Sequence, residues 1–487
     1  MASRHLASVS RWLRKVPGKL SSRSCTAENY DFRLGSTSLV WTSSGGPAIT
    51  RRCSPFRVVM GIRIASLDTL LLWTRQLMHP RLVPRLSVFM FVQYLIWGSW
   101  YVAMSSYLLG TLNFTGAQTG LAYSAFAIGA MISPFLTGLL ADRWFATEKM
   151  IAVFNLLGAA LLFLLSKLTT FGAFFPVLIA YCVLYVPTLS LGNSLAFHHL
   201  ENPDKEFPRV KIWSAFGWIV AGLIISRLNA ERSPLQFVVA AIISLALGLY
   251  SFTLPHTPPK NVGQKVSAGQ MLGLEALALF RRPSFAIFVL CTFLICIPLY
   301  FYFVMMITYL GQLGWTNPAA KMTLAQVSDM VFLALLPWFL RKLGYKKTLL
   351  LGMLAWLTRY VLMAYGNIPG ALGTAMLYGA IILHGICYDF LFITGQMYVD
   401  DQANERIRGA AQGLIAFVLW GVGAFVGTNL AGRVMDAHKL PLALGAITHD
   451  WRGIWVIPAA LAAGVIVLFA AAFREGRKAI SRNGSDY

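Results

Sequence analysis

The chain has 487 residues, of which 57% are hydrophobic and only 12% are charged. Soluble globular proteins carry roughly 25% charged residues, so the composition excludes an ordinary soluble domain and indicates a protein that crosses a membrane several times. The net charge of +22 would also suit a nucleic-acid-binding protein, but its distribution along the chain argues against nucleic acid as a partner.

Residues 1–77 differ from the rest of the chain. They are rich in Ser, Arg and Gly and contain no apolar stretch long enough to span a bilayer. Their most apolar part, RVVMGIRIASLDTLLLW, is short and interrupted by charges, and no secretory signal with a small-residue cleavage site is recognisable. We expect this segment to be disordered or not translated, with Met60 and Met78 as alternatives to Met1 for the true start.

Twelve apolar segments follow, each close to the ~20 residues that a helix needs to cross a bilayer. They run approximately over residues 86–110, 118–140, 149–166, 171–196, 212–228, 234–254, 284–310, 322–340, 348–364, 371–396, 409–430 and 453–473. The strands of a membrane β-barrel would be shorter and would alternate polar with apolar residues. The pattern therefore predicts transmembrane helices.

A polar stretch divides the twelve segments into two sets of six. Residues 78–254 hold the first six, and residues 255–283 form a cytoplasmic linker that includes an expected surface helix, MLGLEALALFRR. Residues 284–474 hold the second six, and residues 475–487 form a cytoplasmic tail. This layout is typical of the major facilitator fold. We therefore expect an all-α membrane protein with twelve transmembrane helices in two pseudo-symmetric halves.

The basic residues mark one side of these segments. Fourteen of the 41 Lys and Arg residues precede residue 86. With the N-terminus in the cytoplasm, the cytoplasmic segments hold 19 more, the opposite segments hold seven, and Arg359 is left inside a predicted helix. This asymmetry follows the positive-inside rule with both termini in the cytoplasm. The charge is therefore a topology signal rather than a surface for nucleic acid.

The loop after the second segment contains a recognisable pattern. In GLLADRWFATEK, the residues Gly138, Asp142 and Arg143 match the G-x-x-x-D-R pattern of the facilitator gating loop. The corresponding loop after the eighth segment, LRKLGYKK, keeps the cations but lacks the acid. The alternative interpretation is an ordinary basic turn. Because the pattern occurs in a chain with twelve predicted membrane helices, we expect this loop to be the gating loop.

Two acidic residues interrupt apolar segments of the second half, Asp329 in the eighth and Asp389 in the tenth. A charge near the bilayer centre costs at least ~3 kcal/mol on insertion scales. Such a residue usually faces a protein interior or a watery cavity and marks a path for an ion or a substrate. Because burial favours the protonated form of a carboxyl group, these residues can take up a proton on one side and release it on the other. The alternative is a structural ion pair, for which Arg359 is available.

Polar and aromatic residues accompany both acids. Gln326 lies three positions before Asp329 and so shares its helix face. His384 and Tyr388 are four positions apart on one face, and Asp389 is offset by one position. The combination suits a neutral, hydroxylated and partly aromatic ligand. The alternatives are that Gln326 joins helices through hydrogen bonds and that His384 is a packing residue.

The first half also has polar and aromatic residues in its spans. Lys211 opens the fifth segment in FPRVKIWSAFGW, with Trp218 further along the same segment. Lys211 either donates a hydrogen bond into a central cavity or extends to the membrane interface. The first segment, VQYLIWGSWYVAMSSY, is unusually polar and aromatic, and its Gly98 and Ser99 are expected to permit close helix contact.

Several kinds of chemistry find no support in the sequence. The six cysteines lack paired extracellular spacing and a CxxC metal pattern, so we expect packing residues rather than disulfides or a metal site. A Walker phosphate loop, GxSxG and HExxH are absent, which disfavours an ATP-driven pump and a hydrolase. We expect no enzymatic activity, no metal and no cofactor.

Taken together, these residues resemble the nucleoside:proton symporters of the major facilitator superfamily. The similarity covers roughly residues 85–475 and is carried by WGSW, YVPTLSLGNSLAFHHL, RVKIWSAFGW, LPHTP, YDFLFITG and QGLIAF in this order. The resemblance implies proton-coupled nucleoside uptake by alternating access across the bacterial inner membrane. It also implies a protein that works in the lipid bilayer, as a monomer, with the proton as coupling ion.

The resemblance also implies site residues. The amide and acid of the family's eighth helix correspond to Gln326 and Asp329, and the aromatic–acid pair of its tenth helix corresponds to Tyr388 and Asp389. Asp389 is the first choice for the proton site and Asp329 the second. His384, together with the residues named above, is expected to contact substrate. The further candidates for substrate contact are Lys211 and Trp218.

The chain departs from the family pattern at several positions. Asp329 stands where Glu is common, His384 replaces an aromatic residue, and Lys211 replaces an Arg, so that a planar fork becomes a point charge. Tyr300 and Phe303 stand where family members place amides. These departures affect which base and which sugar of a nucleoside the protein would prefer. A sugar or another polar solute is therefore an alternative cargo, and a membrane sensor that transports nothing is a second alternative.

Overall fold

The computed structural model describes the following residues of the protein: 30–35, 38–43, 82–137, 145–259, 274–405, 407–441 and 447–475. The chain forms two compact units, Met1–His79 and Pro80–Tyr487. In the first unit, β1 (Tyr30–Gly35) pairs antiparallel with β2 (Ser38–Ser43). The rest of residues 1–77 lies outside the described residues, so the expectation of a disordered or untranslated segment stays a prediction.

The first half of the second unit consists of six apolar helices. They are Leu82–Gly110, whose last part is α3 (Met104–Gly110), α4 (Gly116–Leu136), α5 (Thr147–Leu165), α6 (Phe171–His199), α7 (Pro203–Arg227) and α8 (Leu235–Ser251). The start of α4 illustrates how sequence sets a helix end. The Thr115 hydroxyl accepts from the Gln118 backbone N–H at 3.0 Å, and Gln118 Oε1 accepts from the Thr115 N–H at 2.9 Å. This capping box satisfies two backbone donors that the helix leaves unpaired.

The second half follows a short 3₁₀ helix, η2 (Leu274–Arg281), which occupies the position of the predicted surface helix. Its elements are α10 (Pro283–Gln312), α11 (Pro318–Met322), α12 (Leu324–Tyr365), α13 (Ala371–Ile382), α14 (His384–Tyr388), the π-helical turn η3 (Asp389–Ile393), α15 (Thr394–Gln402), α16 (Arg408–Ala416), the π-helical segment η4 (Phe417–Gly423), α17 (Ala424–Ala437) and α18 (Trp451–Ala472). The shorter pieces join into two long helices, Ala371–Gln402 and Arg408–Ala437.

The long helix α12 contains two of the predicted spans. At Gly344 its backbone has a φ of 71° and a ψ of 179°, a conformation that glycine adopts readily and other residues do not. Ten helices in the described part of the chain are long and apolar enough to cross a membrane. Division of α12 at Gly344 and inclusion of the shorter α8, with 17 residues, give the twelve helices that the sequence predicts.

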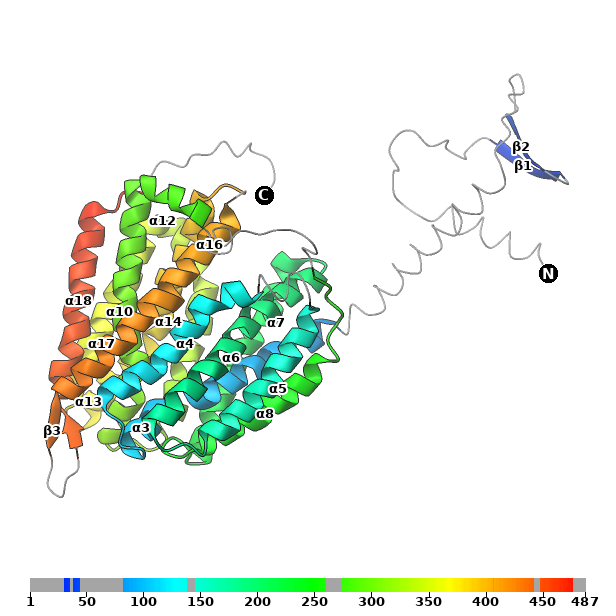
Figure 1. The fold of residues 1–487 in the computed structure, drawn as a ribbon. Coiled ribbons are helices and arrows are strands. Elements are labelled where there is room, and N and C mark those ends of the chain that lie inside the picture. The colour runs from blue at the N-terminus through cyan, green and yellow to red at the C-terminus, as the bar shows by residue number, and fades with distance from the viewer. Residues whose placement is uncertain are drawn as a thin grey trace. The chain divides into compact units, whose positions relative to one another are not determined.

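The two six-helix halves lie side by side, with blue to green helices in the first and green to red helices in the second (Figure 1). In the first half, α5 packs against α6 and α8; in the second, α12 packs against α14 and α18. The halves meet where α4 contacts α17 and η4, and where α7 contacts α11 and α12. The predicted fold class, an all-α membrane protein of the major facilitator type, is confirmed.

The halves touch closely at one end of the bundle, which we call the closed end and which is lowest in Figure 1. Glycines make this contact possible between α4 and α17. A Cβ atom added at Gly120 would collide with the carbonyl oxygen of Thr428 and would lie 3.0 Å from the Cα of Gly432. Small residues let helix backbones approach to this extent.

Side-chain hydrogen bonds also join the halves at the closed end. The hydroxyl groups of Ser105 in α3 and Thr308 in α10 are 3.1 Å apart. The backbone N–H of Ala320 in α11 donates to the hydroxyl of Ser226 in α7 at 2.8 Å. The described residues therefore form a seal between the halves at this end.

A small antiparallel hairpin follows α17, formed by β3 (Lys439–Pro441) and β4 (Ile447–His449). The side-chain oxygen of Gln312, the last residue of α10, accepts from His449 Nδ1 at 3.2 Å and from Trp451 Nε1 at 3.0 Å. His449 is only 7% exposed. The hairpin is therefore tied to the end of α10.

Asp436 in α17 places a negative charge on the first turn of α4. Its carboxylate accepts from the backbone N–H groups of Gly116 at 2.7 Å and Ala117 at 2.6 Å. A carboxylate at a helix N-terminus contributes up to about 1 kcal/mol in exposed positions. We therefore expect Asp436→Asn to favour opening of the closed end by about fivefold. The measurement is the rate at which a membrane-impermeant maleimide labels a Ser105→Cys variant.

The matched control for this experiment is Asp450→Asn. Asp450 caps α18 by accepting from the Gly453 N–H at 3.0 Å, a contact that lies within one half. The control should leave the labelling rate of Ser105→Cys unchanged. Equal labelling rates in Asp436→Asn and in its parent would contradict a role of Asp436 in the seal.

Candidate functional site

The two intramembrane acids come together from different helices. Asp389 is the first residue of the π-helical turn η3 and is 1% exposed, whereas Asp329 is half-buried on the first part of α12. Their carboxyl groups lie close enough to interact electrostatically. An ionised carboxylate only accepts hydrogen bonds, so a hydrogen bond between the two groups requires a proton on one of them. The pair is therefore an arrangement that can hold a proton inside the bundle.

Each acid also has an oxygen without a protein partner. Asp329 Oδ1 and Asp389 Oδ2 are enclosed and make no hydrogen bond among the described residues. Carboxyl oxygens are hydrogen-bond acceptors, so these two atoms are available to a donor group of a ligand. A π-helical turn at this position fits that interpretation, since such turns frequently occur at functional sites.

A close contact between α12 and α14 brings the acids together. The hydroxyl of Ser328 donates to the carbonyl oxygen of Ile382, and the N–H of Gly385 donates to the same hydroxyl at 3.3 Å. A side chain at Gly385 would collide with the backbone of Ser328. The sequence alone did not reveal this glycine, because a single Gly inside an apolar segment carries no specific signal.

Arg359 does not pair with either acid. It is 0% exposed, and no ion pair joins it to a carboxylate in the described part of the chain. Instead its Nη1 lies 2.8 Å from Nδ1 of His384, and its guanidinium carbon lies 3.7 Å from the ring centroid of Tyr302. The alternative interpretation, a structural ion pair between Arg359 and an acid, is wrong for this conformation.

His384 and Tyr388 lie on one helix face and stack, with ring centroids 5.8 Å apart and an interplanar angle of 26°. His384 also stacks on Tyr302 of α10 at 5.6 Å. Tyr388 further contacts Trp420 of η4 at 6.4 Å. An aromatic layer therefore leads from α10 to the acid pair, and Tyr302 is a member that the sequence interpretation missed.

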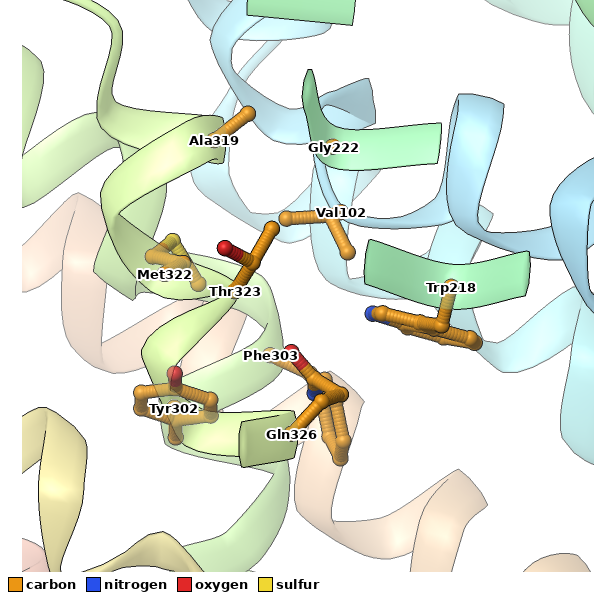
Figure 2. Close-up of a pocket in the computed structure, with 9 residues that line it drawn as sticks. All are labelled: Val102, Trp218, Gly222, Tyr302, Phe303, Ala319, Met322, Thr323 and Gln326. Carbon is orange, nitrogen blue, oxygen red and sulfur yellow. The ribbon is translucent and has the colours of Figure 1, made fainter. Parts of the chain in front are cut away.

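A small pocket lies at the interface of the two halves, as Figure 2 shows. It is lined by Val102, Trp218 and Gly222 of the first half and by Tyr302, Phe303, Ala319, Met322, Thr323 and Gln326 of the second. The structure thus brings together Trp218 and Gln326, which the sequence singled out separately. The close approach of Thr323, whose Cγ2 would lie 2.7 Å from a Cβ at Gly222, narrows the space on the side of the closed end.

Aromatic residues continue the pocket wall into the first helix. Trp97 stacks on Phe126 at 4.5 Å and meets Trp218 edge-on at 5.0 Å. Tyr101 contacts Phe303 across the two halves at 5.7 Å. Phe303 is one of the residues that line the pocket, whereas Tyr300 is buried in the core at 2% exposure.

The side chain of Lys211 makes its hydrogen bonds within the first half. Its Nζ donates to the Tyr94 hydroxyl at 2.8 Å and to Asn193 Oδ1 at 3.4 Å, and it lies 4.5 Å from the Tyr94 ring centroid. Lys211 lies seven positions before Trp218, which corresponds to about 10 Å along a helix. Of the two interpretations from sequence, this geometry favours the interior donor over extension to the interface.

The predicted gating loop lies in a part of the chain that the structure does not describe. Gly138, Asp142 and Arg143 lie outside the described residues, so that assignment stays a prediction. The four cysteines in the described part, Cys182, Cys291, Cys296 and Cys387, are free and buried, as expected for packing residues.

The protein consists of two halves of apolar helices, with a pocket between the halves and a pair of carboxyl groups inside the second half. These features define a multi-pass membrane transporter of the major facilitator type. A family model described as nucleoside H+ symporter matches residues 81–478. The chain belongs to this family.

Individual relatives agree with the family match. The chain is 38% identical over 407 residues to YegT of Escherichia coli (strain K12), covering 82% of this chain and 95% of YegT. It is 33% identical over 404 residues to the xanthosine permease of the same organism, covering 80% and 95%. The crystal structure of the nucleoside transporter NupG matches with a TM-score of 0.73 at 30% identity, covering 81% of this chain and 100% of NupG.

Proposed function

We propose that the protein is a symporter that takes up nucleosides together with protons by alternating access. The observation that carries this proposal is the enclosed, closely spaced pair of Asp329 and Asp389. It lies on helices that also supply Gln326 to the pocket and Tyr388 to the aromatic layer. The family match and the relatives named xanthosine permease and nucleoside permease support a nucleoside as cargo.

We assign the proton to Asp389 first and to Asp329 second. Two ionised carboxylates in one enclosed site repel each other, and each loses hydration. Protonation of Asp389 removes one charge and permits the hydrogen bond within the pair. Closing of the halves around a protonated pair is therefore less costly than closing around two anions. This difference links proton binding to the conformational change.

The remaining residues bind the nucleoside in this proposal. The aromatic rings of Tyr388 and Trp218 offer apolar faces for the base, and the amide of Gln326 offers a donor and an acceptor to base or sugar. His384 adds a hydrogen bond from its ring edge. Lys211 holds Tyr94 in place at the other side and donates to ligand oxygens when the cavity is open.

The setting of the protein follows from the same proposal. It lies in the bacterial inner membrane with both termini in the cytoplasm, surrounded by lipid, and works as a monomer. The coupling ion is the proton, and neither a metal nor another cofactor takes part. No nucleic acid is bound.

Counterflow in proteoliposomes tests the choice of cargo. Vesicles loaded with unlabelled uridine, inosine or xanthosine should accumulate the labelled form of the same compound, whereas vesicles loaded with a disaccharide should not accumulate labelled disaccharide. Exchange of the disaccharide alone would assign the protein to sugars. An absence of exchange for every compound, together with no substrate-dependent proton movement, would favour the sensor.

A further inference from the structure

Arg359 is a cation enclosed in protein without an acidic partner. Its side chain is fully buried, and its Nε and Nη2 make no hydrogen bond among the described residues. Aromatic rings cover its faces, with Tyr302 at 3.7 Å and Trp356 at 5.3 Å from the guanidinium carbon. Cation–π contacts offset part of the cost of burial. Its Nη1 is hydrogen-bonded to the ring of His384.

This hydrogen bond determines where His384 carries its proton. A guanidinium offers five donors and no acceptor, and it stays protonated in proteins. Nη1 of Arg359 therefore donates, and Nδ1 of His384 accepts through its lone pair at 2.8 Å. An imidazole that accepts at Nδ1 is neutral and carries its hydrogen on Nε2. His384 is thus a donor at its other ring nitrogen.

The neighbours of His384 determine which side of its ring, and therefore which direction, is open to the Nε2–H donor. Tyr302 and Tyr388 stack on its ring, with centroids at 5.6 Å and 5.8 Å, and Arg359 occupies the ring edge at Nδ1. The edge that bears Nε2 is what remains for a ligand. Tyr302 itself lines the pocket between the halves (Figure 2), so the stacked rings connect His384 with that space.

We propose that Arg359 is a positioning residue that holds His384 as a neutral hydrogen-bond donor to the substrate and keeps it out of proton transport. The inference rests on the proposed function and adds a chemical requirement to it. The substrate must present an acceptor oxygen or nitrogen, on its base or its sugar, to Nε2. A substrate that lacks this acceptor leaves the N–H unpaired and binds less tightly.

The surrounding charges explain why His384 does not carry the transported proton. Arg359 contacts it from the second part of α12 and Tyr302 from α10. The two acids lie on the first part of α12 and further along the segment of His384 itself. A second proton on His384 would place two cations in contact. The proton therefore resides on the carboxyl pair, and the histidine and the acids have separate tasks.

The state of the ring can be measured directly by ¹⁵N NMR of the full-length, ¹⁵N-histidine-labelled protein in lipid nanodiscs. The His384 signal is identified by its loss in His384→Gln. In the wild type we expect a protonated Nε2 and an unprotonated Nδ1 at every pH between about 8.5 and 5.5, a range in which an ordinary histidine titrates. In Arg359→Met we expect the signal to titrate within this range. A titrating signal or a protonated Nδ1 in the wild type would overturn the proposal.

Arg452→Met is the matched control for the arginine. Arg452 also lies over an aromatic ring, that of Tyr365 at 4.5 Å, but it is a residue of α18 and makes no hydrogen bond with His384. Its replacement should leave the His384 signal as in the wild type. A titrating His384 in Arg452→Met as well would show that any lost arginine has the same effect, and this would overturn the proposal.

A pair of histidine variants tests the donor without changing Arg359, so it remains decisive if Arg359→Met does not fold. Glutamine places its amide nitrogen near the position of Nε2, whereas asparagine places its polar atoms near Nδ1. We expect His384→Gln to bind labelled uridine within about threefold of the wild type and His384→Asn to bind about tenfold more weakly. Equal binding by the two variants would overturn the donor role. A wild type that binds no nucleoside would overturn the proposed function, while the NMR titration would still decide the role of Arg359.

Discussion

Asp389→Asn is expected to exchange labelled nucleoside across a membrane but to lose the ability to concentrate it. Asparagine has nearly the shape of the protonated acid and keeps a donor toward Asp329, so the site can still form and close. It cannot release a proton, so uptake loses its link to the proton gradient. One charge moved across 100 mV is worth about 2.3 kcal/mol, which corresponds to about 50-fold accumulation. The accumulation ratio should therefore fall from about 50 to about 1 in energised vesicles, while counterflow persists.

The control for this experiment is Asp400→Asn. Asp400 is a half-exposed acid on α15 that pairs with Arg408 at 3.1 Å, away from the acid pair. It should concentrate nucleoside like the wild type. Full concentrative uptake by Asp389→Asn would exclude Asp389 as the essential proton site, and Asp329→Asn would then be tested in its place.

Gly120→Leu is expected to prevent the halves from meeting at the closed end and thereby to stop net transport. Gly120 lies against the backbone of Thr428 and Gly432, where even a Cβ atom would collide. Overpacking of this kind typically costs about 1–3 kcal/mol, which shifts a two-state equilibrium by about 5- to 150-fold. Uptake should fall by a comparable factor, since every transport cycle passes through the sealed state. Maleimide labelling of a Ser105→Cys variant should become correspondingly faster.

Gly464→Leu provides the matched control. Gly464 lies in α18, and no atom lies within 4 Å of a Cβ atom built there. The same substitution at this position should leave uptake and labelling unchanged. If Gly120→Leu transports as well as Gly464→Leu, the glycine contact between α4 and α17 is not part of the cycle.

The sequence predicted the helices well because hydropathy is a property of each segment by itself. Twelve apolar stretches of spanning length and a polar linker are visible without any knowledge of contacts. The division of α12 at Gly344 shows the same point, since the cationic stretch LRKLGYKK already separated two spans. The presence of two acids in the path was also predictable, because an uncompensated charge in lipid is costly.

The contacts between helices were not predictable in the same way. Nothing in the spacing of Asp329 and Asp389 along the chain says that they come together, since they lie on different helices and their distance depends on packing at Gly385. For Arg359, the sequence suggested a contact that the structure does not contain. Its charge suggested an acid as partner, but the structure joins it to His384 and Tyr302. Pocket residues such as Val102 and Thr323 carried no signal, because small residues of these types are common in every span.

The hairpin after α17 responds to acidity through His449. Burial lowers the pKa of this histidine to about 4, and the nearby Lys439 adds to the effect. In an unfolded segment the same side chain would titrate near its ordinary value of about 6.5. The hairpin's hold on Gln312 is therefore at full strength above that value and weakens progressively as the pH falls toward 4. A carrier that works down a proton gradient thus has, at its closed end, a hairpin whose attachment to α10 weakens in acid.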